Sequence, residues 1–277
     1  MSGLTDIGRK TPLILVGCGK MGGALIAGWL ARGVDPKALI VVEPNKTALP
    51  KLPKAVRVVA SASRLPKGAA PRAVVFAVKP QVMDGVVPDY AGFRDAKALF
   101  LSIAAGKPVA YFEKRLGTGA RVIRAMPNTP AAVGRGMTVL IAGKSAAKKD
   151  RALATALLSA AGEVAWIEDE DLMDAVTAVS GSGPAYIFYL IESLAEAGQK
   201  AGLLPDLAMK LARETVIGAG ELARQSDLGA DILRKNVTSP GGTTEAALKV
   251  LMGPGGLGKI MARAVAAAKR RSRELAG

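Results

Sequence analysis

A glycine-rich loop near the N-terminus constrains the fold of this chain more than any other feature. The apolar run Leu13–Val16 leads directly into Gly17-Cys-Gly-Lys-Met-Gly22, and a helical pattern follows at once. In such a strand–loop–helix unit Gly17 permits the tight turn, Gly19 lets the backbone approach a pyrophosphate, and Gly22 lets helix and strand pack closely. The helix N-terminus adds N–H donors for the phosphates. The predicted cofactor contacts of this loop are Gly17, Cys18, Gly19, Lys20, Met21 and Gly22.

Short apolar runs alternate with helical or turn-rich segments as far as residue 167. Most of these runs are continuous, as expected for strands that are covered on both faces. Strands that alternate with helices predict an α/β fold, here a Rossmann-type, doubly wound and mostly parallel sheet. The predicted strands are Leu13–Val16, Leu39–Glu43, Val56–Val59, Ala73–Val78, Leu99–Ile103, Arg121–Met126, Met137–Ile141 and Val164–Ile167.

The pattern changes after the acidic cluster Glu168-Asp-Glu-Asp171, beyond which no β-branched run occurs. Glycine and proline separate the remaining helical segments, with Pro184 and Pro205 each in a first helical turn. We therefore expect a dinucleotide-binding Rossmann domain over 1–168 and an all-helical dimerisation and substrate domain over 169–277. The acidic cluster suits the N-terminus of a helix, and a metal site there is the less favoured alternative.

The composition excludes several classes of chemistry. The chain has no His and one Cys, which removes disulfides, zinc sites of His and Cys ligands, and all His-based acid–base catalysis. We expect no metal.

The charge balance of 38 Lys and Arg against 23 Asp and Glu gives +15, but aromatic residues make up only 4% and do not interleave with the basic ones. We therefore expect no nucleic-acid partner. A dinucleotide phosphate and a carboxylate substrate would suit this field, and a merely solvated basic surface is the alternative.

No segment has the length and apolar character expected of a signal peptide or a membrane-spanning helix. The first apolar run, Pro12–Val16, is too short for a signal peptide, and Ser180-Gly-Ser-Gly-Pro184 interrupts the longest uncharged stretch. We expect a cytoplasmic protein. The apolar helix over residues 186–201 exceeds what a small helical domain can bury by itself, which predicts an obligate dimer.

The end of the second strand bears on the choice of cofactor. Glu43 follows the last glycine of the loop by about 20 residues, where an acidic side chain binds the ribose hydroxyls and repels a 2′-phosphate. Alone, Glu43 indicates NAD. Asn45 and Lys46 come next and could bind a phosphate if the loop turns Glu43 outward. A solvent-exposed strand end is the plain alternative for Glu43.

Three further loops follow successive strands and predict one continuous cofactor groove at the carboxyl edge of the sheet. Lys79 would bring a positive charge near the phosphates, and the small residues around Ala104 would leave room for a nicotinamide ring. The predicted contacts of these loops are Ala77, Val78, Lys79, Pro80, Ala104 and Asn128, in addition to Glu43 and Asn45.

The helical half contains a second motif, Asn236-Val-Thr-Ser-Pro-Gly-Gly-Thr-Thr244. Backbone N–H groups just before a helix form a small anion site suited to a carboxylate. Ordinary capping of that helix by Thr or Ser is the alternative reading.

Together these motifs resemble the pyrroline-5-carboxylate reductase family, over nearly the whole chain from Gly17 through the last helix. The resemblance implies reduction of 1-pyrroline-5-carboxylate to L-proline, the last step of proline biosynthesis, with NADPH as cofactor and NADH as the alternative. It also implies a homodimer, often assembled into a decamer. Besides the glycine-rich loop, the motifs are Phe76-Ala-Val-Lys-Pro-Gln81, Arg124-Ala-Met-Pro-Asn-Thr-Pro-Ala131, Val179-Ser-Gly-Ser-Gly-Pro-Ala-Tyr186 and Ser239-Pro-Gly-Gly-Thr-Thr244.

Within the resemblance, the helical motif receives specific roles. The amides of Ser239, Gly241 and Gly242 would hold the substrate carboxylate, with Thr243 beside them, and the Thr244 hydroxyl would contact the ring nitrogen. The active site would lie between the cofactor domain of one subunit and the partner's Thr-rich helix start. The loop after the second strand departs from the family pattern, because some relatives carry Asn-Arg there and this chain reads Glu43-Pro-Asn-Lys46.

Imine reduction also fits the residues that are present. A ketone becomes an alkoxide on hydride attack and needs a proton donor, whereas a protonated cyclic imine becomes a neutral amine directly. A chain without His can therefore catalyse it by orientation. The nearest rival, a β-hydroxy-acid dehydrogenase, would require a Lys inside the helix that follows Pro184, but Lys200 comes only near its end.

Overall fold

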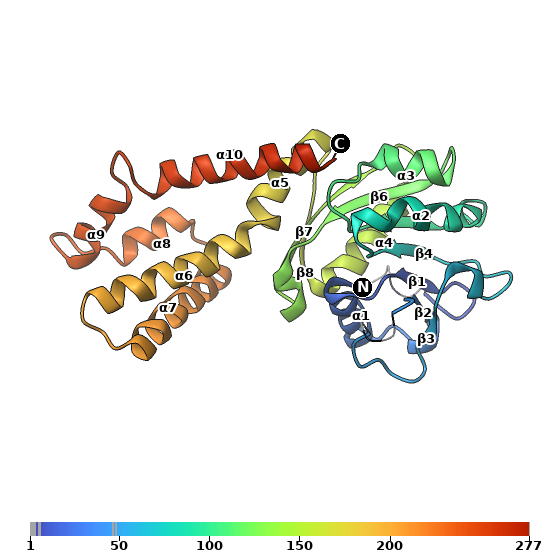
Figure 1. Cartoon of the computed structure of the whole chain (residues 1–277), viewed down its shortest axis with the longest axis horizontal. Coiled ribbons are helices and arrows are strands. Elements are labelled where there is room, and N and C mark those ends of the chain that lie inside the picture. The colour runs from blue at the N-terminus through green and yellow to red at the C-terminus, as the bar shows by residue number, and fades with distance from the viewer. Residues whose placement is uncertain (1–3, 5–6, 46, 48, 277) are drawn as a thin grey trace. The chain divides into compact units, whose positions relative to one another are not determined.

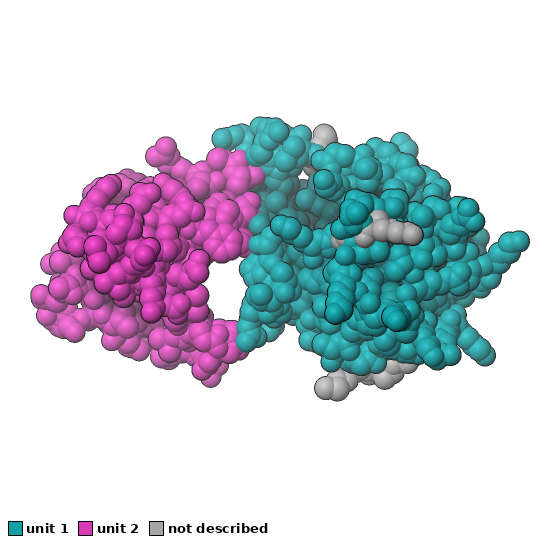
Figure 2. Space-filling view, turned by 60° about the horizontal axis from the view of Figure 1, so that its bottom comes forward, with its two compact units in different colours: residues 1–181, 269–277 teal, residues 182–268 magenta. Residues whose placement is uncertain are grey.

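The computed structural model describes residues 4, 7–45, 47 and 49–276, and Lys46 therefore lies outside the described residues. The chain forms two compact units, one of residues 1–181 with 269–277 and one of residues 182–268 (Figure 2). Among the described residues no helix is both long and apolar enough to cross a membrane.

The first unit is built on one sheet of eight strands in the order β3-β2-β1-β4-β5-β6-β7-β8 (Figure 1). All neighbouring strands are parallel except β6 and β7, which are antiparallel. The predicted doubly wound, mostly parallel sheet is confirmed, with strand ends shifted by no more than two residues. The strands are β1 Leu13–Val16, β2 Leu39–Val42, β3 Arg57–Val59, β4 Ala73–Phe76, β5 Leu99–Ser102, β6 Arg121–Met126, β7 Gly136–Ala142 and β8 Gly162–Trp166.

Alternate residues of each central strand enter two separate cores, which explains why the strands are continuously apolar. In β1, Leu13 and Leu15 belong to one core and Ile14 and Val16 to the other. Helices α1 and α4 contribute to the first core, and α3 and η5 to the second. The indole N–H of the buried Trp29 donates to the Leu157 carbonyl at 2.8 Å, so α1 and α4 are joined without an unpaired polar group.

The helices of this sheet domain include several short 3₁₀ turns. The α-helices are α1 Lys20–Ala31, α2 Met83–Val86, α3 Val109–Leu116 and α4 Lys148–Leu158. The 3₁₀ segments are η1 Pro36–Ala38, η3 Ala62–Arg64, η4 Pro80–Val82, η5 Val87–Arg94, η6 Thr129–Val133 and η7 Ser159–Ala161.

A connecting segment follows β8 and leads to the helical unit. It consists of the 3₁₀ turn η8 (Glu170–Leu172), helix α5 (Met173–Val176) and a π-helical turn η9 (Thr177–Gly181). The Glu170 carboxylate accepts hydrogen bonds from the Arg124 guanidinium at 2.8 Å and from the Val109 amide, the first of α3, at 2.9 Å. Glu170 thus fastens this segment to the sheet domain.

The second unit is entirely helical, and it contains the helices predicted at Pro184 and Pro205. Its helices are α6 Gly183–Lys200, α7 Pro205–Gln225, α8 Ala230–Asn236, α9 Thr243–Leu251 and the greater part of α10 Leu257–Ala276. The sequence analysis missed the short helix α8. Large apolar side chains of α6 and α7 are exposed, among them Ile187, Leu190, Leu194, Ile217 and Leu222.

Candidate active site

The sheet reverses its strand order between β1 and β4, which is where open α/β sheets bind their ligands. Four loops follow strands β1, β4, β5 and β6 at the carboxyl edge of the parallel part of the sheet. The predicted cofactor residues of the described chain lie in these loops, in the loop after β2 and in the first residues of α1 and η4, and all of them belong to the first unit. The structure thus brings together the loops expected to form the cofactor groove.

The glycine-rich loop has the geometry of a phosphate cradle. Gly17 has φ +86°, and a Cβ there would lie 2.6 Å from the Val78 side chain, so the loop of β1 is pressed against the loop of β4. A Cβ on Gly19 would meet no atom within 4 Å, so the loop is open where a pyrophosphate would approach. Gly19 is also the N-cap of α1 and has no side chain to occupy the N–H groups of the first turn. These residues fit a dinucleotide.

Glu43 connects this loop to the loop after β2. One of its carboxylate oxygens accepts from the Cys18 amide at 2.9 Å and the other from the Asn45 amide at 2.9 Å. Both oxygens therefore already hold backbone donors of the cofactor site, a role that the sequence analysis did not foresee. Asn45 in turn accepts from the Thr47 hydroxyl at 2.7 Å, so its side chain orders the same exposed loop.

Cys18 has no role as a nucleophile in this arrangement. Its side chain is fully buried, and burial, together with the nearby Glu43 carboxylate, raises the pKa of the thiol to about 11. Since the thiolate is the reactive form, Cys18 is a packing residue of the loop at neutral pH.

The other cofactor loops differ in exposure. Lys79 is exposed directly before the 3₁₀ turn that Pro80 opens, and Ala77 and Val78 are half-buried. Ala104 is buried, and its amide donates a long hydrogen bond, of 3.3 Å, to the Ser102 hydroxyl. Lys79 can thus reach a phosphate, whereas the Ala104 methyl group contributes shape rather than a polar contact.

Asn128, in the loop after β6, uses its side chain within the protein. Its Oδ1 accepts from the Met137 amide at 2.8 Å, and its Nδ2 donates to the carbonyl of Ser180 at 3.2 Å and to the Ser180 hydroxyl at 3.3 Å. Asn128 therefore joins the start of β7 to the π-helical turn.

The residues predicted to bind substrate lie together in the second unit, at the N-terminus of α9. The Gly242 amide donates to the Ser239 carbonyl at 3.0 Å, which closes a turn, and Gly241 has φ +71°. Thr243 and Thr244 are the first two residues of α9, and Thr244 is half-buried while Ser239 is exposed. The turn and the helix start place backbone donors and hydroxyl groups within one short segment.

A carboxylate of the chain itself already sits at this turn. Glu245, the third residue of α9, accepts from the Gly241 amide at 2.5 Å. A carboxylate at the start of a helix is favoured by the helix dipole. The contact shows that the Gly241 amide can bind a carboxylate. An acidic residue at the third helical position is the signal that could have identified Glu245 in the sequence.

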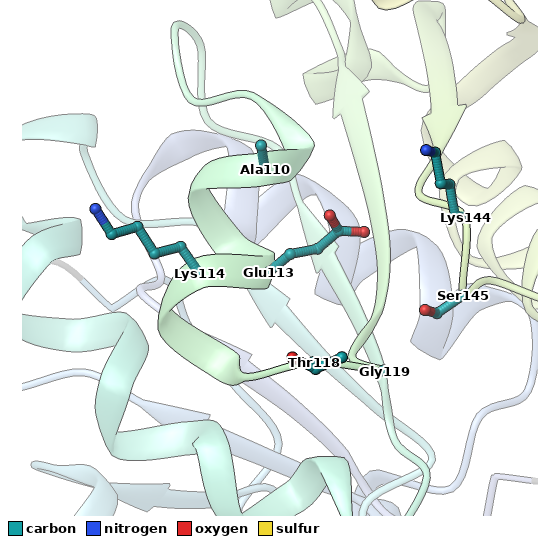
Figure 3. A pocket seen from close by; sticks show the side chains of 7 residues that line it. All are labelled: Ala110, Glu113, Lys114, Thr118, Gly119, Lys144 and Ser145. Carbon is teal, nitrogen blue, oxygen red and sulfur yellow. The ribbon is translucent and has the colours of Figure 1, made fainter.

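Two further features of the described residues bear on alternative sites: the possible metal ligands and a hollow at the opposite edge of the sheet. No group of three potential metal ligands occurs among the described residues, and Glu168 and Glu170 are paired with Arg151 and Arg124. A hollow of about 450 Å³ lies between α3 and the turn after β7, and Figure 3 shows the side chains that line it. Thr118 and Gly119, which line it, precede β6, so it lies at the edge of the sheet opposite the cofactor loops.

Comparison with known proteins finds a matching family profile for each half of the chain. Residues 170–275 match the family profile described as "Pyrroline-5-carboxylate reductase dimerisation". Residues 13–106 match the profile described as "NADP oxidoreductase coenzyme F420-dependent". The chain is similar to the pyrroline-5-carboxylate reductase of Pseudomonas aeruginosa, with 39% identity over 96% of this chain and 98% of that protein.

Solved structures agree with the sequence comparison. The structure of a pyrroline-5-carboxylate reductase from Coxiella burnetii is similar with a TM-score of 0.87 and 34% identity, covering 96% of this chain and 98% of that one. The pyrroline carboxylate reductase of Plasmodium falciparum, solved with NADP bound, gives a TM-score of 0.80 and 29% identity over 97% and 99% of the two chains.

Proposed function

The chain belongs to the pyrroline-5-carboxylate reductase family, and from this we propose that it reduces 1-pyrroline-5-carboxylate to L-proline, the last step of proline biosynthesis. One observation carries the proposal: the identity to the Pseudomonas aeruginosa enzyme extends over 268 residues, so that it spans both the cofactor loops and the α9 turn. The arrangement of small, rigid loops without any His agrees with reduction of an imine.

We assign NADPH as the cofactor, with NADH as the alternative. The Plasmodium falciparum relative was solved with NADP bound, and the profile over 13–106 is that of an NADP oxidoreductase. The inward position of the Glu43 carboxylate supports the assignment, since it bonds to the Cys18 and Asn45 amides. A carboxylate held in this way is a weaker obstacle to a 2′-phosphate than one that projects into the ribose site.

The reaction requires little proton transfer from the protein. When bound, the reduced nicotinamide supplies a hydride. The carbon of the substrate's N-protonated C=N group would accept it, the π electrons would become the lone pair of the nitrogen, and a neutral amine would result. The protein has to orient the imine and exclude water, and orientation alone can supply roughly 7–11 kcal/mol of the lowering of the barrier.

We propose that the α9 turn holds the substrate. The amides of Ser239, Gly241 and Gly242 would receive the carboxylate, with Thr243 beside them. The Thr244 hydroxyl would contact the ring nitrogen and orient the C=N carbon. The Glu245 carboxylate bonds to the Gly241 amide in this structure, so the substrate carboxylate would displace it from that amide. Because the Gly242 amide closes the turn with Ser239, it would be shared with that contact.

Three further proposals concern the location, the assembly and the domain boundaries of the chain. We propose a cytoplasmic homodimer, assembled further into a decamer, with a Rossmann domain over 1–168 and a dimerisation domain over 169–277. The dimerisation profile at 170–275 supports this division, and the exposed apolar side chains of α6 and α7 supply a surface for a second copy.

The proposal is tested by steady-state oxidation of NADPH and of NADH with the imine as substrate. We expect turnover with both cofactors, a higher kcat/KM with NADPH, and proline as the product. Turnover of a β-hydroxy acid in place of the imine would overturn the proposal, although Lys200, the last residue of α6, is poorly placed for that chemistry.

A further inference from the structure

We infer that Asn128 is a positioning residue for the reduction: its side-chain amide fixes the π-helical turn from which the helical unit begins, rather than binding the cofactor. The inference rests on the proposed function, because the effect of Asn128 is expected in the rate of imine reduction. It revises the role that the sequence analysis expected for this residue.

The hydrogen bonds of Asn128 connect two segments of the first unit, and we call this arrangement the clamp. The side chain accepts from the backbone of Met137, 9 residues away, and donates to the carbonyl and the hydroxyl of Ser180, 52 residues away. An asparagine side chain offers one carbonyl oxygen and two N–H donors. The oxygen and the nitrogen of the side-chain amide therefore bond to two separate segments of the same unit.

The clamped element is unusual in its geometry. Residues Thr177–Gly181 form a π-helical turn, a rare structure that occurs mostly as a single turn and often at functional sites. The Thr177 hydroxyl donates to the Met173 carbonyl at 2.9 Å, a local bond of the kind that bends helices. A side chain on Gly181 would come within 2.6 Å of the Met126 methyl group. Met126 thus packs against Gly181, and Asn128 bonds to Ser180, so that two successive residues of the turn are held.

The position of this clamp relates it to the reaction. Met126 ends β6 and Asn128 follows in the loop, at the carboxyl edge where the cofactor loops lie. The π-helical turn ends at Gly181, which is also the last residue of the first unit before Ser182, and α6 starts at Gly183. Asn128 therefore couples the rim of the cofactor groove to the origin of the helical unit. Its loss frees the turn without removing a ligand of the phosphates.

The test uses the full-length protein and the variants Asn128→Ala and Asn128→Asp. For Asn128→Ala we expect kcat with the imine to fall roughly 10- to 100-fold, as small displacements of reacting groups do, while the Kd for NADPH stays within about twofold of the wild type. Hydrogen exchange of the backbone amides of 177–183 should become faster. Ser180→Ala is the matched control, because it removes only the hydroxyl acceptor and leaves the carbonyl one.

Asn128→Asp gives a readout that depends on the donor alone. An ionised carboxylate cannot donate to the Ser180 carbonyl, whereas a protonated one can. We expect its kcat relative to wild type to recover as the pH is lowered toward about 4, near the ordinary pKa of an aspartate carboxyl group. This comparison is made within one protein preparation, so it holds even if the alanine variant folds poorly.

Any of three results would overturn the inference. A raised Kd for NADPH with unchanged kcat would make Asn128 a cofactor ligand, and a lower Tm with unchanged kcat and Kd would make it a structural fastening only. Failure of the proposed function is distinguishable from these: the wild type would not reduce the imine, yet hydrogen exchange at 177–183 would still respond to Asn128→Ala. Unchanged exchange in that variant would by itself remove the clamp.

Discussion

At the residue scale we expect the glycine-rich loop and the α9 turn to contribute separately to cofactor and substrate binding, and Thr244 offers the clearest test. It is the second residue of α9 and half-buried, beside the turn that would hold the carboxylate. We predict that Thr244→Ala lowers kcat with the imine by about 100-fold, as loss of a group that assists at the reacting nitrogen does. The Kd for NADPH should stay unchanged, because the cofactor loops belong to the other unit. Titration followed by cofactor fluorescence measures the Kd for NADPH, and steady-state kinetics measure kcat.

Thr244→Ser is the control for Thr244→Ala, since it keeps the hydroxyl at the second position of the same helix. Equal losses in the two variants would indicate that the helix start as a whole was disturbed. A kcat of wild-type size in Thr244→Ala would remove Thr244 from the site.

Glu43 provides the second prediction at this scale. Its carboxylate holds the amides of Cys18 and Asn45, so Glu43→Ala should weaken NADPH and NADH to a similar degree, by about 1–3 kcal/mol. The preference between the cofactors should stay nearly the same. Isothermal titration with each cofactor measures this, with Glu163→Ala, at an exposed position of β8, as the control. A selective gain for NADPH would show that Glu43 faces the 2′-phosphate.

The sequence located these residues but not their bonding. Glu43 was expected at a strand end, and it lies there, yet local sequence does not decide whether a carboxylate turns toward a ribose or toward a neighbouring amide. The same holds for Asn128, whose partner Ser180 is 52 residues away. Such long-range contacts depend on the packed fold, and spacing in the sequence contains no record of them.

At the scale of elements, the ion pair between Arg124 and Glu170 is one of the contacts that hold the connecting segment to the sheet domain. Arg124 is 8% exposed in its side chain and Glu170 30%, and their 2.8 Å contact ties η8 to β6. Removing one partner of a buried pair costs about 3–5 kcal/mol, and the partial exposure of Glu170 reduces this to about 2 kcal/mol. We predict that loss in the free energy of unfolding for Glu170→Ala, measured by urea denaturation.

Asp171→Ala is the matched control, because Asp171 lies next to Glu170 and is exposed. A loss of equal size in the control would assign the effect to the helix start rather than to the ion pair. An unchanged unfolding midpoint in Glu170→Ala would contradict the role given to this carboxylate.

The elements that could be predicted are those with a strong periodic signal. Six of the eight strands consist of buried or half-buried, mostly apolar residues, whereas β3 is largely exposed and β8 carries the exposed Glu163. Pro184 and Pro205 marked two helix starts. Helix α8 was missed because it has only seven residues, four of them charged or amide side chains. The π-helical turn has no distinct pattern, since it differs from an α-helical turn only in its hydrogen bonding.

At the scale of the whole molecule, the helical unit exposes large apolar side chains that another copy of the chain could cover. Ile187 and Leu190 of α6 are 47% and 43% exposed, and α7 adds Ile217 at 54%. We predict that sedimentation of the wild type gives a dimer or a multiple of it at micromolar concentration. Leu190→Glu should shift the protein to monomers, because a charge in an apolar interface is desolvated without a partner.

The interface variant also tests whether activity needs the second copy. We expect Leu190→Glu to lose turnover with the imine and to keep the Kd for NADPH, while Lys200→Glu at the end of the same helix serves as the control for added negative charge. A wild-type protein that sediments as a stable monomer would contradict the dimer.

The central claim, reduction of a cyclic imine by direct hydride transfer from the nicotinamide, is tested most directly by isotope transfer. NADPH deuterated at the transferred position of the nicotinamide would be incubated with the enzyme and 1-pyrroline-5-carboxylate, and the product analysed by mass spectrometry and NMR. The account predicts L-proline with one deuterium at the ring carbon that formed the C=N bond. Proline without deuterium at that carbon, or no proline while NADPH binds, would contradict it.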